Sequence, residues 1–247
     1  MFYYPSSTYR RSKKKQKLLY CAIFMKFNTS FKERVEHAIK NGKELVDSFN
    51  DKSIQNVVLW LDLLGFQKQL LTDKKTALLR ISVFHELTLT SVSDELHIAQ
   101  LNDATVISMD FENDDNPENL TRFLAKCDTL FEMSTYADRE VGGFGTRGVI
   151  TLGLRQGLRG NFGGIALDQN LTVDKIRFSS PIAIMMNMAF AKSYHLESSG
   201  GLLKEPSLYI EECLMNNYEI MISPHWDDHG RFDYNGNRYV IVRRDQE

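Results

Sequence analysis

One apolar run interrupted by a single acid constrains this chain more than any other feature. Residues 57–66 have the sequence VVLWLDLLGF, in which Asp62 is the only charged residue and Gly65 follows it closely. The β-branched and bulky apolar residues predict a central strand over 57–63 that is covered on both faces. A carboxylate inside such a strand must be paired, hydrogen-bonded or bound to a metal, because burying it alone costs several kcal/mol.

The composition is that of an ordinary globular protein, with 247 residues and a formal net charge of −2. This balance gives no reason to expect nucleic acid as a partner. Cys21, Cys127 and Cys213 are widely spaced, as expected for reduced thiols, and no apolar run reaches the about 18 residues of a membrane-spanning helix. We therefore expect a cytoplasmic protein without direct membrane insertion and without a nucleic-acid partner.

Three regions follow one another along the chain. Residues 1–28 form a basic leader that resembles a secretory signal but lacks a small-residue cleavage site, so we interpret it as disordered, with Met25 as an alternative start. Residues 29–50 predict an amphipathic helix that packs beside the sheet or contacts a regulatory or dimer partner. Residues 51–247 predict one α/β sandwich domain.

The first half of this domain predicts a helix, a hairpin and a second helix after the central strand. The helical pattern starts at Phe66, and residues 94–111 predict two antiparallel strands with Asp103 at or next to their turn. A helix then begins near Asn116. Its buried apolar stripe includes Cys127, which we interpret as a core residue.

The second half begins with a strand after Arg147. Residues 154–164, LRQGLRGNFGG, predict a hairpin or flexible loop, with a phosphate-binding loop as the alternative. Residues 181–197 predict a helix that carries Asn187 and Lys192. Residues 208–215 fit either a closing strand or a short strand that enters a helix.

The pair of acids Asp62 and Asp103 is the main candidate for chemistry. If their strands are neighbours, the two carboxylates converge, and no basic residue stands beside either of them in the sequence. Such a pair is an oxygen-ligand site for a hard divalent cation. The alternative interpretation is that each acid caps its own turn.

The order of these motifs resembles class III nucleotidyl cyclases. LWLDLLGF and LNDATVIS resemble the two strands that carry the metal-binding aspartates of that family. RGVITLG resembles the strand after the central helix, MMNMAFAKSYHLESSG resembles the helix with the transition-state Asn and Arg, and LYIEECL resembles the strand that follows. The resemblance covers roughly residues 55–216 in the family's order and implies a ferredoxin-like βαββαβ core with a central, mainly antiparallel sheet and flanking helices.

The resemblance also implies the site. Asp62 and Asp103 would hold two Mg²⁺ or Mn²⁺ ions, and Asn187 would orient the ribose. The family's Arg falls on Ala191 in this chain, so Lys192 is expected to supply the charge, with other cations as substitutes, namely Arg147, Arg155, Arg159, Lys175 and Arg177. Contacts to the substrate are expected from Phe66, Gln100 and Ser180.

The expected substrate is a nucleoside triphosphate, because the resemblance implies its cyclisation with release of pyrophosphate. The positions that read a purine in the family fall on Ala99 or Gln100 and on Ser180, which match neither adenylate nor guanylate cyclases. This departure is similar to the pyrimidine cyclases of Pycsar antiphage systems. The resemblance therefore implies a uridylate or cytidylate cyclase, UTP being favoured, a homodimer with shared sites, and a downstream effector that senses the cyclic nucleotide.

Two other hypotheses remain open at this stage. Ala191 also fits a degenerate cyclase-like domain that binds a nucleotide or a partner without chemistry. The segment HWDDHG, residues 225–230, fits a metal-dependent phosphodiesterase, although adjacent polar residues of this kind are more typical of a solvated turn.

Overall fold

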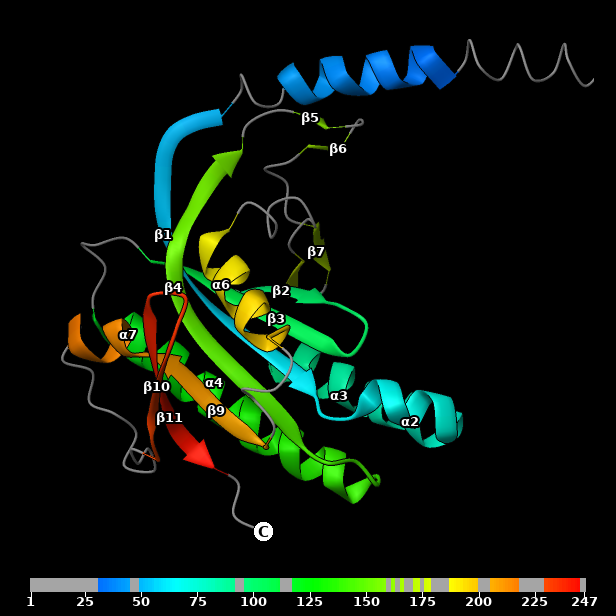
Figure 1. Cartoon of the computed structure of the whole chain (residues 1–247), viewed down its shortest axis with the longest axis vertical. Coiled ribbons are helices and arrows are strands. Elements are labelled where there is room, and N and C mark those ends of the chain that lie inside the picture. Colours follow the sequence, from blue (N-terminus) through cyan, green and yellow to red (C-terminus); the bar gives the residue numbers. More distant parts are fainter. Residues whose placement is uncertain are drawn as a thin grey trace, which may run out of the picture.

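A nine-stranded sheet with helices on both faces forms the computed structural model of the chain (Figure 1). The structure describes residues 31–44, 49–91, 96–111, 117–158, 161–162, 165–166, 171–173, 176–178, 187–199, 205–217 and 229–244. Within this part, the strand order is β10-β11-β9-β4-β1-β3-β2-β8-β7, and a separate two-stranded sheet pairs β5 with β6. The leader, Ser180 and residues 225–228 lie outside the described residues, so the interpretations made of them are not addressed by the structure.

The centre of the sheet is a βαββαβ unit. Its strands follow the spatial order β4-β1-β3-β2, and each is antiparallel to its neighbours. The elements are β1 (Phe49–Leu63), α2 (Phe66–Thr72), α3 (Lys74–Ser91), β2 (His97–Gln100), β3 (Ala104–Phe111), α4 (Pro117–Glu140) and β4 (Thr146–Leu158). This arrangement confirms the predicted ferredoxin-like core with a mainly antiparallel sheet and flanking helices.

Later segments extend the sheet at both edges. At one edge β9 (Ser207–Glu211) is parallel to β4 and is followed by β11 (Asn237–Arg244) and β10 (Arg231–Tyr234). At the other edge are β8 (Ile176–Phe178), parallel to β2, and β7 (Leu171–Val173). The short strands β5 (Asn161–Phe162) and β6 (Ile165–Ala166) are antiparallel, which agrees with the predicted hairpin in the Gly- and Arg-rich segment.

The alternation of side chains along β1 gives the sheet two different faces. Val57, Leu59, Leu61 and Leu63 belong to the larger core cluster, together with residues of α3 and α4. Val58 and Trp60 belong to a second cluster that includes residues of α6 (Met188–Glu197). Because β1 is covered on both faces, residues 57–61 are almost completely buried, as the sequence predicted. Asp62 continues the alternation on the α6 face.

Several elements differ from their predicted bounds. β1 begins at Phe49 instead of Val57, and α6 begins at Met188, so Asn187 caps this helix and does not lie inside it. β9 enters α7 (Glu212–Asn217) directly, which confirms the second of the two interpretations. The C-terminal hairpin turns at Asn235 and Gly236, both with positive φ, which is a signal that the sequence analysis did not use.

The N-terminal helix over residues 31–44 is surrounded by solvent. Its apolar side chains at Phe31, Val35 and Ile39 are 64%, 40% and 55% exposed. They lie four residues apart, on one stripe of the helix. A helix therefore forms here, but it covers 31–44 and not the predicted 29–50, because β1 already begins at Phe49, and its apolar stripe does not enter the core of this chain.

A fully buried arginine fixes the turn after β1. Arg80 of α3 donates two hydrogen bonds to Asp138 of α4, at 2.7 and 2.9 Å, and one to the carbonyl of Leu64 at 2.8 Å. Asp138 also accepts a bond from the backbone N–H of Gly145 at 2.8 Å. This ion pair ties both helices to the turn that directly follows Asp62.

Candidate active site

Asp62 and Asp103 meet at one end of the sheet, as predicted. Asp62 is opposite Ala104 in the pairing of β1 with β3, and the backbone N–H of Leu63 donates to the carbonyl of Asp103 at 3.0 Å. Asp103 lies in the turn between β2 and β3. Antiparallel pairing of β1 with this hairpin therefore brings the turn beside the end of β1. We call this region the acid end.

The expectation that nothing basic is near the acids is wrong. Arg147 of β4 is opposite Asp62 in the sheet and donates to its Oδ2 at 2.8 Å. The same guanidinium also contacts Glu197, at the end of α6. The sequence could not show this ion pair, because it depends on the register between two strands 85 residues apart.

Burial dominates the electrostatics of the acid end. Asp62 is only 6% exposed, and its burial raises its pKa from 3.8 to about 7 against the attraction of Arg147, with the negative charges of Asp103 and Glu197 adding to the rise. Asp62 and Glu197 thus share one guanidinium, and the charge of Asp103 acts on Asp62 as well. A second positive charge at this place would stabilise the ionised form of Asp62.

The acid end fits a divalent cation only in part. Among the described residues, no group of three His, Cys, Asp or Glu side chains is arranged to hold a metal ion by itself. Mg²⁺, however, is usually held by one or two carboxylates together with substrate phosphates and water. Asp62 and Asp103 supply carboxylates of that kind, and burial together with the negative charges of Asp103 and Glu197 raises the pKa of Asp62. A bound cation would favour its ionised form, so the residues present fit such an ion.

Asn187 lies at the opposite end of α6. Its Oδ1 accepts hydrogen bonds from the backbone N–H groups of Ala189 and Phe190, at 2.9 and 3.3 Å, and so caps the helix. Its Nδ2 donates to Oδ1 of Asn56 on β1 at 2.6 Å. Asn187 is 4% exposed and pins the start of α6 onto the sheet.

A polar network continues from Asn187 to an arginine that the sequence analysis named only among the substitutes. Asn56 donates to the carbonyl of Met109 and to Oδ1 of Asp110, both at 2.9 Å. Arg155 of β4 donates to both carboxylate oxygens of Asp110, at 2.9 and 2.6 Å, and forms a β-bridge with Asn187. We call these four side chains, Asn56, Asp110, Arg155 and Asn187, the amide end.

A single chain does not bring the two ends together. Asn56, which holds Asn187, precedes Asp62 by six residues on the same strand. At about 3.3 Å per residue, the two ends are separated by about 20 Å along β1. One triphosphate group cannot contact Asp62 and Asn187 of the same chain at once.

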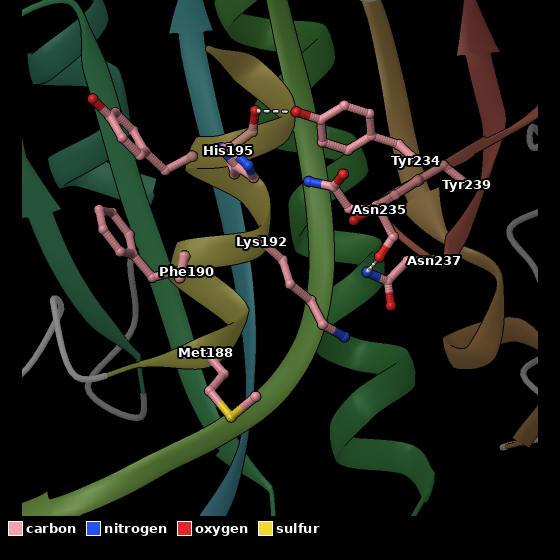
Figure 2. A pocket seen from close by; sticks show the side chains of 10 residues that line it. Met188, Phe190, Lys192, His195, Tyr234, Asn235, Asn237 and Tyr239 are labelled. Carbon is pink, nitrogen blue, oxygen red and sulfur yellow. Dashed lines mark hydrogen bonds between the residues drawn. The ribbon is translucent and has the colours of Figure 1, made fainter. Parts of the chain in front are cut away.

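Lys192 points away from both ends. Its ammonium donates to Oε1 of Glu211 at 2.6 Å and to the carbonyl of Leu152 at 2.8 Å. Figure 2 shows this side chain directed from α6 across β4 toward the C-terminal hairpin, whereas Phe190 points to the other side of the helix. Lys192 and Ala191 line a groove of about 620 Å³ between α6 and that hairpin.

The two predicted substrate contacts that the structure describes, Phe66 and Gln100, make their contacts on the α3 and α4 side of the sheet and not on the α6 face. Phe66 is 3% exposed and belongs to the core cluster of the α3 and α4 face. The side-chain amide of Gln100 donates to the carbonyl of His85 at 2.9 Å and to Thr88 Oγ1 at 3.4 Å. Ser180 lies outside the described residues, and the three roles stay predictions.

Solved structures of similar fold are nucleotide cyclase domains. The chain is similar to the guanylyl cyclase Cya2, with 11% identity over 79% of this chain and 95% of that chain and a TM-score of 0.45. It is also similar to a bacterial light-regulated adenylyl cyclase, with 13% identity, 92% and 64% coverage and a TM-score of 0.49. A third is the guanylyl cyclase domain of the RhoGC fusion protein from the aquatic fungus Blastocladiella emersonii, with 14% identity, 78% and 97% coverage and a TM-score of 0.43.

Comparisons with models of protein families and with curated protein sequences find no match. No described helix is long and apolar enough to cross a membrane.

Proposed function

We propose that this chain is a nucleotidyl cyclase that converts a nucleoside triphosphate into its 3′,5′-cyclic monophosphate and pyrophosphate. The observation that carries the proposal is the convergence of Asp62 and Asp103 at one sheet end, where the pKa of Asp62 is raised to about 7. Buried carboxylates crowded in this way favour the binding of positive charge. A triphosphate that arrives with divalent ions supplies this charge.

In the proposed reaction, the ribose 3′-oxygen forms a bond to the α-phosphorus. The bond between that phosphorus and the oxygen bridging to the β-phosphate breaks, pyrophosphate leaves with the electron pair, and the 3′-hydroxyl proton goes to water. Two bound Mg²⁺ or Mn²⁺ ions would supply Lewis-acid stabilisation of the attacking and leaving oxygens. Asp62 and Asp103 would hold this charge, and Arg147 would keep Asp62 oriented.

The proposed substrate is UTP, with CTP as the alternative. What supports this choice is the sequence, in which Gln100 and Ser180 occupy positions that read purines in the cyclases it resembles. By the same resemblance to Pycsar pyrimidine cyclases, the product would be a second messenger in antiphage defence, read by a separate cyclic-nucleotide-sensing effector.

The proposed active form is a head-to-tail homodimer. The two ends of the α6 face lie about 20 Å apart along β1, so in the proposed dimer a second copy would supply its amide end, with Asn187, to the acid end of the first. Asp62→Ala and Asn187→Ala chains should each be inactive alone, while a mixture contains heterodimers with one intact site. Recovery of activity on mixing supports the shared site, and mixtures as inactive as their parents contradict it.

The direct test is to incubate the purified chain with Mn²⁺ and each of the four nucleoside triphosphates in turn. Released pyrophosphate and the product masses are measured, with a chelator as the control. The proposal expects metal-dependent release with a cyclic product, largest from UTP. Absence of a cyclic product from all four nucleotides would refute it.

A second candidate function is nucleotide binding without turnover. It is favoured by the ion pair of Lys192 with Glu211, which commits the predicted catalytic cation to a carboxylate of its own chain. Calorimetry that shows binding of a nucleoside triphosphate, together with no pyrophosphate release, would select this candidate over the cyclase.

A further inference from the structure

We infer that Arg155 is the cation that contacts the substrate phosphates beside Asn187, in place of Lys192. This inference rests on the proposed function. It assigns to Arg155 the positive charge that is missing at Ala191, where the cyclases that the sequence resembles have an arginine. The juxtaposition that supports it is direct, because Arg155 and Asn187 form a β-bridge and are joined by side chains through Asp110 and Asn56.

The geometry of Arg155 suits a phosphate contact. Its guanidinium is 26% exposed and is held by two hydrogen bonds to Asp110, one from Nε and one from Nη2. A guanidinium has five N–H donors, so three of them are not used by Asp110. The side chain is therefore fixed in orientation on one edge, and among the described residues its hydrogen bonds leave the other edge able to donate to a phosphate oxygen.

The other described cations near the site are committed elsewhere. The ammonium of Lys192 bonds to Glu211, which is buried at 5% side-chain exposure, and to a backbone carbonyl. Arg147 is bonded to Asp62 and Glu197 at the acid end, so it already belongs to the metal side of the proposed site. Among the residues whose side chains the structure describes, Arg155 is thus the cation that is joined to Asn187.

Asp110 and Asn56 act as positioning residues in this arrangement. Asp110 accepts from both Arg155 and Asn56, and Asn56 is completely buried and bonds to Asn187. One carboxylate therefore sets the relative orientation of the guanidinium and the amide. We expect Asp110→Asn to lower kcat, because the guanidinium of Arg155 is still present but is no longer held in position.

The test compares Arg155→Ala, Arg155→Lys and the full-length wild type by steady-state kinetics and by calorimetric binding of UTP with Ca²⁺. Arg122→Ala, an exposed arginine of α4 on the other face of the sheet, is the matched control. We expect Arg155→Ala to lower kcat by about 100-fold, the usual effect of removing one donor to developing charge, with a much smaller change in KM. Arg155→Lys and added guanidinium ion should each restore part of the activity.

Each outcome decides the inference. A kcat of Arg155→Ala within threefold of the control would overturn it, as would a large loss of kcat that neither lysine nor guanidinium rescues. If the wild type binds UTP without turnover, the proposed cyclase activity is refuted. In that case, weaker UTP binding by Arg155→Ala but not by Arg122→Ala still supports the phosphate contact. If the wild type shows neither turnover nor binding, both proposals fail.

Discussion

The acid end and the amide end of the α6 face are polar for different reasons. At the acid end, Asp62 is crowded by Asp103 and Glu197, and its pKa is raised to about 7 although Arg147 donates to it. At the amide end, both the Oδ1 and the Nδ2 of Asn187 form hydrogen bonds within the chain. Added positive charge would therefore stabilise the ionised form of Asp62 at the acid end. The amide end is instead a rigid support, on which the guanidinium of Arg155 is partly exposed.

The largest effect is expected from removing the carboxylate at the acid end. Asp62→Ala should lower the rate of pyrophosphate release at least 1,000-fold, or about 4 kcal/mol, because the proposed metal site loses one of its carboxylates. Glu132→Ala, at an exposed position of α4, serves as the control. A residual rate within tenfold of the control would show that Asp62 does not take part in the chemistry.

At the amide end, we expect substitution of Asn187 to lower the stability of the fold. Asn187→Ala removes the cap of α6 and leaves the buried Oδ1 of Asn56 without its donor, so we expect a loss of about 2 to 4 kcal/mol in the free energy of unfolding. Asn187→Asp keeps a capping oxygen and should recover part of the loss. Urea unfolding measures both variants, and a loss below 0.5 kcal/mol for alanine would contradict the support role.

Lys192, whose side chain is 27% exposed, and the buried Glu211 form an ion pair that belongs to neither end. Lys192→Met should lower the free energy of unfolding by about 1 to 3 kcal/mol, because the charge of Glu211 is left inside the protein. Adding Glu211→Gln to this variant should recover part of that loss. Equal stability of the wild type and Lys192→Met in thermal unfolding would show that the pair is not formed in solution.

In the absence of metal, we expect Asp62→Asn to raise the free energy of unfolding, by less than the losses given above. Because the folded pKa of Asp62 is about 7 and its unfolded value is about 3.8, the unfolded state loses this proton first as the pH rises. Asp62 therefore stabilises the fold less at pH 8 than at pH 4. We expect Asp62→Asn to be about 1 to 2 kcal/mol more stable than the wild type at pH 8, part of the gain being lost with the Arg147 ion pair.

The same comparison at pH 4 and in excess Mn²⁺ sharpens this prediction. At pH 4 the difference between Asp62→Asn and the wild type should fall toward zero, because Asp62 is then protonated in the folded state. With Mn²⁺ at pH 8 the wild type should gain stability relative to the variant. A difference in thermal unfolding that does not change with pH would contradict the raised pKa.

The sequence by itself determined most of the elements, and it offered Asp62 and Asp103 as a pair on the condition that their strands are neighbours. The continuous apolar run in 57–63 predicted a doubly covered strand, helical periodicity predicted α4 and its buried Cys127, and the predicted hairpin placed Asp103 at or next to a turn. These features follow from local periodicity and from strand pairing over a short stretch of chain. The fold class could therefore be predicted without coordinates.

Only the tertiary structure decided which charges meet. Arg147 joins Asp62 across 85 residues, Arg155 joins Asp110 across 45, and Arg80 joins Asp138 across 58. Each pair depends on the register of strands or the packing of helices, and a shift of one residue would turn these strand side chains to the other face. For the same reason, the start of α6 at Met188 and the distance between the two ends of its face could not be read from the sequence.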